Sequence, residues 1–211
     1  MTREVTEAGR FGPIEWAVAG RPMPGEDTSG DEAIAVDLGG RAALFGVIDG
    51  LGHGPAAASA AQRAAQVIAG QPALTLPALV DACHRELADT RGAAMTLACI
   101  DFERDSLQWL GVGNVTAARV SRAANGVANS AFARLTSGIV GFRLPPIPTP
   151  EPLEMRPGHL LVVASDGVAE NHLDAVDFAA SAKAIANRIL GEHTRVIDDA
   201  LVLVARHRGA T

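Results

Sequence analysis

The chain has 211 residues, of which 48 % are hydrophobic and 20 % are charged, a composition typical of globular proteins with a sizeable core. Its formal net charge is −6, and no run of Lys or Arg forms the basic face that a nucleic-acid partner requires. No apolar run approaches the roughly 20 residues of a membrane span, and the N-terminus lacks the order of a signal peptide. With only two cysteines, we expect a protein of the reducing cytoplasm that binds neither nucleic acid nor membrane.

Apolar patterns predict strands first, then two helices, then strands again. Strands are predicted at residues 14–19, 33–37, 42–48, 95–101, 106–111, 115–120, 132–135, 159–164 and 200–205. Helices are predicted at 55–69, about 76–90 and about 174–190. No repeat or long linker divides the chain, so we expect one domain over residues 1–211. This order of elements predicts an α+β sandwich rather than a parallel βαβ fold.

Acidic residues recur at the ends of the predicted strands. The four acids in such positions are Asp31, Asp49, Asp166 and Asp198. An acid at one strand end is usually a turn former, but a core sheet could bring four together at one edge. Clustered carboxylates repel each other unless a cation neutralises them, and such hard oxygen ligands favour Mg²⁺ or Mn²⁺. The pattern therefore predicts a metal site.

The glycine-rich turn at residues 50–54 (GLGHG) allows a second interpretation. Lying between a strand and a helix, it formally matches a dinucleotide-binding fingerprint. Asp49, however, would place a negative charge beside the pyrophosphate, and Pro55 removes one N–H from the helix start. No apolar strand with a terminal acid follows about 20 residues later, so dinucleotide binding is not expected.

Four segments resemble, in order, the motifs of metal-dependent PPM-type Ser/Thr protein phosphatases, and in particular their SpoIIE-like branch. They are residues 29–31 (SGD), 49–54 (DGLGHG), 164–167 (ASDG) and 198–201 (DDAL). Each motif alone is weak, but four in this order over nearly the whole chain are a strong signal. Within the branch, the short DGLGHG-plus-helix form and residues 138–142 (GIVGF) are most similar to the RsbX-type phosphatases, which act alone in stressosome signalling.

The resemblance implies a PPM-type αββα sandwich, in which two mainly antiparallel β-sheets are flanked by helices. It also implies two Mn²⁺ or Mg²⁺ ions at one edge, with water between them attacking phosphorus in line and no covalent phospho-enzyme. The implied metal ligands are Asp49 as the bridge, the Gly50 carbonyl, Asp166 and Asp198 at one ion, Asp31 at the other, and Asp199 as a less central ligand. Asp49 and Asp166 are thereby the implied catalytic residues.

Three further residues of the sequence bear on the reaction. The phosphate-binding arginine of other PPM enzymes has no clear match, because the surroundings of Arg21 do not fit that motif; phosphate binding through the metals alone is expected. His53 is either a proton donor to the leaving oxygen or a residue that packs or caps beside the glycine turn. Asn114, after Gly113, is expected in a tight hairpin turn.

The resemblance implies a phosphatase that acts on phosphoserine or phosphothreonine in STAS-domain proteins of the stressosome and resets the stress response. One alternative is a phosphatase of a phosphorylated anti-sigma-factor antagonist, which would activate the response instead. The lack of a regulatory segment in these 211 residues favours the resetting role. Another alternative is a catalytically silent PPM fold that only binds its partner, against which the retained acids argue.

Overall fold

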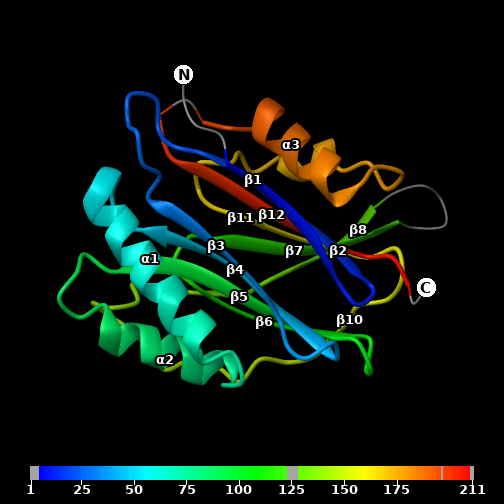
Figure 1. The fold of residues 1–211 in the computed structure, drawn as a ribbon, viewed down its shortest axis with the longest axis horizontal. Coiled ribbons are helices and arrows are strands. Elements are labelled where there is room, and N and C mark those ends of the chain that lie inside the picture. Colours follow the sequence, from blue (N-terminus) through cyan, green and yellow to red (C-terminus); the bar gives the residue numbers. More distant parts are fainter. Residues whose placement is uncertain (1–4, 123–127, 196, 210–211) are drawn as a thin grey trace.

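The computed structural model describes residues 5–122, 128–195 and 197–209, which form two β-sheets packed face to face with helices on the outer faces (Figure 1). In sheet A the strand order is β1 (Val5–Phe11), β2 (Ile14–Arg21), β12 (Ala200–His207), β11 (Leu160–Ala164), β7 (Thr116–Arg122) and β8 (Ala128–Phe132). In sheet B it is β10 (Leu153–Glu154), β6 (Ser106–Val112), β5 (Ala93–Asp101), β4 (Ala42–Gly50) and β3 (Asp31–Asp37), with β9 (Leu135–Thr136) beside β6. Among these described strands only the β6–β9 pair is parallel, so the predicted α+β sandwich of mainly antiparallel sheets is confirmed.

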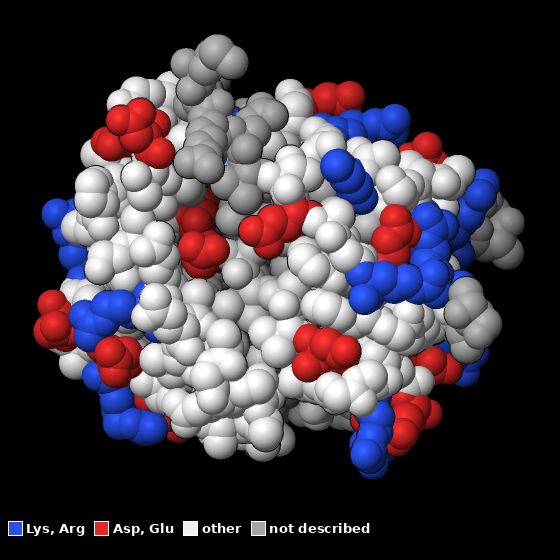
Figure 2. All heavy atoms as spheres, in the orientation of Figure 1, with Lys and Arg blue, Asp and Glu red and all other residues white. Residues whose placement is uncertain are grey.

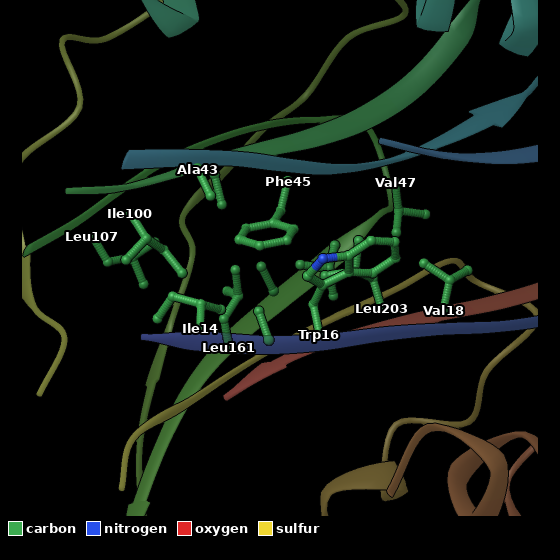
Figure 3. Packing of buried hydrophobic residues seen from close by; sticks show 14 of the residues in the cluster. Ile14, Trp16, Val18, Ala43, Phe45, Val47, Ile100, Leu107, Leu161 and Leu203 are labelled. Atoms are coloured by element: carbon green, nitrogen blue, oxygen red, sulfur yellow. The ribbon is translucent and has the colours of Figure 1, made fainter. Parts of the chain in front are cut away.

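The core between the sheets holds the two layers together. Figure 3 shows Phe45 of β4 and Trp16 of β2 pointing into this space, with ring centroids 6.5 Å apart. Phe11 of β1 packs on the same indole ring at a centroid distance of 5.5 Å. Alternate residues of each strand face this core, as the two-residue period of a strand requires. The layers therefore keep their strand ends in a fixed relation at the edge of the sandwich.

Helices cover the two outer sheet faces. On sheet B lie α1 (Gly54–Gly70), which has Pro55 in its first turn, and α2 (Leu76–Glu86), while α3 (Ala182–Glu192) lies on sheet A (Figure 1). The side chain of Thr75 accepts a hydrogen bond from the N–H of Ala78 at the start of α2, and Ser181 does the same for Ala184 at the start of α3. Alanines on the buried face of α1 let it approach the sheet closely.

Several elements differ from those predicted from the sequence, and the helix expected at about 76–90 ends at Glu86. The helix expected at about 174–190 is a short 3₁₀-helix, η1 (His172–Ala175), followed by a turn and then α3, because the carboxylate of Asp177 accepts from the N–H of Ala179 and Ser181 starts a new helix. Strand β1 was not predicted at all, since its polar sequence, VTEAGRF, shows little alternation. It forms by pairing along its whole length with β2.

The strand expected at 132–135 and the turn at Asn114 also need correction. Residue 132 ends β8 in sheet A, whereas Leu135 begins β9 in sheet B, so the predicted strand spans a crossing between sheets. Asn114 does not lie in a hairpin, because β6 and β7 on either side of it belong to different sheets. This connection carries the chain across the edge of the sandwich and places Asn114 there.

None of the described helices is long and apolar enough to cross a membrane. On the face shown in Figure 2, Lys and Arg side chains lie mostly toward the outer parts of the view, whereas several Asp and Glu side chains lie nearer its centre. Much of the centre of this face is uncharged. The described residues of this face therefore form no continuous basic patch. Acidic residues are instead found together at the strand ends.

Candidate metal centre

Four acids meet at one end of the sandwich, where loops from both sheets come together (Figure 1). Asp31 begins β3 and lies directly opposite Asp49 of β4 in the antiparallel register of sheet B. Asp166 follows β11 and Asp198 precedes β12, and these two strands are neighbours in sheet A. Since Asp49 interacts electrostatically with both Asp166 and Asp198, the predicted grouping of strand-end acids is present in the fold.

Burial and neighbouring charges raise the pKa values of three of these acids. Burial, followed by the charge of Asp49, raises the pKa of Asp31 well above its ordinary value, and the side chain is only 8 % exposed. Burial and the charges of Asp166 and Asp198 raise the pKa of Asp49 to about 7. Burial and Asp166 also raise the pKa of Asp198. Each raised pKa means that an ionised carboxylate is unfavourable here unless a positive charge lies nearby.

Two neutral side chains hold acids of this group in place. The hydroxyl of Ser165 donates to Oδ2 of Asp31 at 2.7 Å and accepts from the N–H of Leu201 at 2.9 Å, which joins the two sheets at the site. The side-chain amide of Asn114 donates to Oδ2 of Asp166 at 2.6 Å. The sequence analysis did not assign either residue to the site. Their positions in the chain are the features that could have pointed to them. Ser165 directly precedes the acid of the ASDG motif, and Asn114 lies where the chain passes from one sheet to the other.

Both carboxylate oxygens of Asp199 accept hydrogen bonds from backbone N–H groups. Its Oδ1 accepts from the N–H of Met23 at 2.7 Å, and its Oδ2 accepts from the N–H of Gly30 at 2.9 Å. The side chain is buried, with the loop before β3 folded over it. These two bonds hold the loop that leads to Asp31, and the metal ligation implied for Asp199 stays a prediction.

Glycine is required at two positions beside the acids. A β-carbon on Gly50 would lie 2.1 Å from the carbonyl oxygen of Ala57, and one on Gly167 would lie 1.8 Å from the carbonyl oxygen of Asp199. Both distances are far below van der Waals contact. Strand ends and loops therefore approach each other closely here, and the backbone beside Asp49 and Asp166 is left without side-chain cover.

His53 lies at the start of α1, and its side chain is 58 % exposed. Its Nδ1 is 3.0 Å from Oε1 of Glu26, a residue of the loop before β3. Its side chain makes no capping hydrogen bond to α1. Capping is thus not observed, and an exposed imidazole held by Glu26 is compatible with proton donation.

The side chain of Arg21 connects backbone segments at the edge of the site. Its guanidinium donates to the carbonyl oxygens of Pro22, Asp198 and Arg195, at 3.2, 3.4 and 2.6 Å. It thereby joins the end of β2 to the segment before β12. Because these bonds occupy the guanidinium, the prediction that Arg21 is not a phosphate ligand is in accord with its contacts.

The donor chemistry of the site fits divalent cations. Carboxylate oxygens with raised pKa values, next to backbone left open by Gly50, are the ligands that Mg²⁺ and Mn²⁺ prefer. Within the described ranges, no three acidic, histidine or cysteine side chains already enclose a position for an ion. The Asp residues nevertheless lie at the strand ends of neighbouring strands in the two sheets.

Comparisons with known proteins agree with this geometry. A comparison with curated protein sequences gives no match. Among solved structures, one from work on the bacterial stressosome, a modular system adapted to control secondary messenger signalling, is 29 % identical, with a TM-score of 0.83 over 92 % of this chain and 99 % of that chain. RsbX in complex with magnesium is 18 % identical, with a TM-score of 0.83 over 95 % and 98 %. The catalytic domain of the phosphatase PstP with two manganese ions is 18 % identical, with a TM-score of 0.67 over 93 % and 99 %.

The family assignment rests on the sequence as well as on the fold. The family model for stage II sporulation protein E (SpoIIE) matches residues 39–208, which include Asp49, Asp166 and Asp198. The match covers most of the chain, and the structural neighbours include PP2C-type Ser/Thr phosphatases. The chain belongs to the SpoIIE family of PPM-type protein phosphatases.

Proposed function

We propose that this phosphatase removes phosphoryl groups from serine or threonine residues of STAS-domain proteins in a stressosome-type signalling module and so resets the response. The proposed hydrolysis is supported by one observation: four acids from two sheets lie at one edge of the sandwich. They are Asp31, Asp49, Asp166 and Asp198. The substrate class is supported by the likeness to a structure from stressosome work, at 29 % identity over nearly both chains. RsbX, of the same fold, supports the same choice.

Two Mn²⁺ or Mg²⁺ ions fit the donor set described above. We assign Asp49 to both ions, the Gly50 carbonyl, Asp166 and Asp198 to one, and Asp31 to the other. When bound, such ions would polarise the phosphoryl oxygens and lower the pKa of a water, so that the water could release a proton to solvent and act as the nucleophile toward phosphorus. Asp199, which is held by two backbone N–H groups, is assigned to shaping the loop before Asp31.

Other residues of the chain orient and complete the site. Ser165 and Asn114 hold the carboxylates of Asp31 and Asp166 in fixed rotamers, which lowers the reorganisation needed when cations bind. We assign to His53 the role of proton donor to the leaving serine or threonine oxygen, and to Glu26 the role of orienting the imidazole ring. Catalysis thus requires no nucleophilic side chain.

The direct test is phosphate release from a phosphorylated STAS-domain protein in the presence of Mn²⁺. We expect wild-type turnover to be lost by at least about 100-fold in Asp166→Asn, because a ligand and its negative charge are removed together. Asp81→Asn, at an exposed position on α2, is the matched control and should retain full activity.

A phosphorylated anti-sigma-factor antagonist serves as the second substrate in this assay. Faster release from it than from the stressosome protein would replace the resetting role by an activating one. No release from either substrate, together with no Mn²⁺ binding in calorimetry, would show a silent binding module and overturn the proposal.

A further inference from the structure

A cavity of about 360 Å³ opens beside Asp166 on the outer face of sheet A. Its floor comes from β7 and β8, and its wall from the segment after β11. Apolar atoms of Ala117, Phe132 and Val168 line much of it, and Asn114 and Asp166 border it on the side of the metal centre. The cavity therefore borders the proposed metal centre.

Phe132 is notable among these lining residues because its side chain is 66 % exposed. A large aromatic ring left in water at the edge of a cavity is an unfavourable arrangement that a bound apolar group would relieve. Two carboxylates, Asp166 and Glu170, also border the cavity. These carboxylates disfavour an acidic side chain of the substrate, and the apolar lining favours an apolar side chain.

Arg195 supplies positive charge at the same cavity. Its backbone is fixed on both sides, since its N–H donates to the carbonyl of Gly167 at 2.7 Å and its carbonyl accepts from Arg21 at 2.6 Å. The side chain of Arg195 is exposed and borders the same cavity as Asp166. A cation held this close to the acids is well placed to meet phosphoryl oxygens.

A second cavity, of about 380 Å³, borders the acid cluster on the side of Asp31, and it differs in charge. Glu7, Asp27 and Glu32 line it, and the guanidinium of its one lining arginine, Arg21, is engaged by backbone carbonyls. A phosphorylated segment would meet like charge there. The cavity beside Asp166 is lined by fewer carboxylates and by the exposed Arg195, and it is therefore the better site for a phosphorylated segment.

We propose that the cavity beside Asp166 is the substrate subsite, in which an apolar side chain next to the phosphoserine or phosphothreonine packs against Phe132 and Val168 while Arg195 pairs with the phosphoryl group. The occupant is a flanking residue of the phosphoprotein substrate. This inference rests on the proposed phosphatase function and adds a sequence preference to it. It also assigns to Arg195 a contact with phosphate that the sequence analysis left to the metals alone.

The test measures binding, by fluorescence anisotropy in the presence of Mn²⁺, of two labelled peptides that carry a non-hydrolysable phosphonate analogue of phosphoserine. One peptide has leucine on both sides of the analogue and the other has glycine. Wild-type protein is expected to bind the leucine peptide at least tenfold more tightly. Phe132→Ala should reduce this preference to less than threefold, and its exposed position makes it safe for folding.

Arg195→Ala should weaken binding of both peptides at least fivefold, and Arg195→Lys should recover part of the loss because it keeps the charge. Arg188→Ala, which removes an exposed arginine from α3, is the control and should bind like wild type. Equal wild-type affinities for the two peptides, no binding of either, or unchanged binding by Phe132→Ala and Arg195→Ala would overturn the inference. Mn²⁺-dependent hydrolysis of an aryl phosphate, measured separately, tests the phosphatase function without this subsite, so the two failures are distinguishable.

Discussion

Asp49 links the stability of the protein to its chemistry at the scale of one residue. Its pKa is about 7 in the folded protein, whereas an unfolded aspartate titrates near its ordinary value of 3.8. Between these values the folded state binds more protons than the unfolded state, so the free energy of unfolding falls as the pH rises through this window. The metal-free protein is accordingly expected to be less stable at pH 8 than at pH 5.

Asp49→Asn removes this negative charge while keeping the shape of the side chain. At pH 8 and without metal, we expect the variant to be about 2 kcal/mol more stable than wild type, with a Tm about 4–8 °C higher, and its loss of stability with rising pH to be smaller. The variant should lose Mn²⁺-dependent turnover. Calorimetric scans from pH 5 to pH 8 measure both effects, and an unchanged pH dependence would show that Asp49 is not the group responsible.

Asp199 allows a second test at this scale, which separates a shaping role from metal ligation. Asp199→Ala leaves the buried N–H groups of Met23 and Gly30 without their acceptor, so we expect a loss of about 3 kcal/mol in urea denaturation without metal. Asp89→Ala, which breaks an exposed ion pair with Arg63, is the control, with a loss below about 1 kcal/mol. Unchanged metal-free stability combined with lost Mn²⁺ binding would instead make Asp199 a ligand.

At the scale of elements, the turns after β4 and β11 set how closely the strand ends approach their neighbours. We expect Gly50→Ala and Gly167→Ala each to cost about 3 kcal/mol or more, because the added methyl group meets a backbone carbonyl at 2.1 and 1.8 Å. Gly70→Ala, at the end of α1 with no atom within 4 Å, should instead be neutral or stabilising by up to about 1 kcal/mol. Chemical denaturation of the three variants checks this, and equal effects would contradict the close approach.

Elements also show where local sequence patterns are sufficient. The apolar strand at 200–205 was predicted because a strand buried on both faces has a continuous apolar sequence, and β12 lies in the interior of sheet A. Strand β1 was missed because an edge strand is held by pairing with its neighbour rather than by burial of an apolar face. The helix at 174–190 was predicted too long because capping by Ser181 interrupts it.

At the scale of the whole molecule, cations at the acid cluster would join the two sheets, since Asp31 and Asp49 come from sheet B and Asp166 and Asp198 from sheet A. A ligand that binds only the folded state stabilises it by about 2.7 kcal/mol at a concentration of 100 Kd. We expect saturating Mn²⁺ to raise the Tm at pH 8 by about 5–10 °C. In Asp166→Asn the rise should be less than half as large, and in Asp81→Asn it should equal that of wild type. A rise of equal size in Asp166→Asn would place the ions elsewhere.

The sequence by itself determined the family, the class of fold and the identity of the clustered acids. Those features are local: apolar periods define strands, and a motif such as DGLGHG keeps its acid and glycines adjacent in the chain. Asp49 and Gly50 could be named for that reason, without knowledge of their neighbours in space.

Only the tertiary structure decided which groups surround these acids. Asn114 could not be assigned because its position depends on β6 and β7 lying in different sheets, and Arg195 because its place depends on bonds to Gly167 and Arg21, both distant in sequence. The double engagement of Asp199 by Met23 and Gly30 is likewise invisible in its motif. Hydrogen bonds and cavities join residues more than a hundred positions apart, and local propensity contains no information about such pairs.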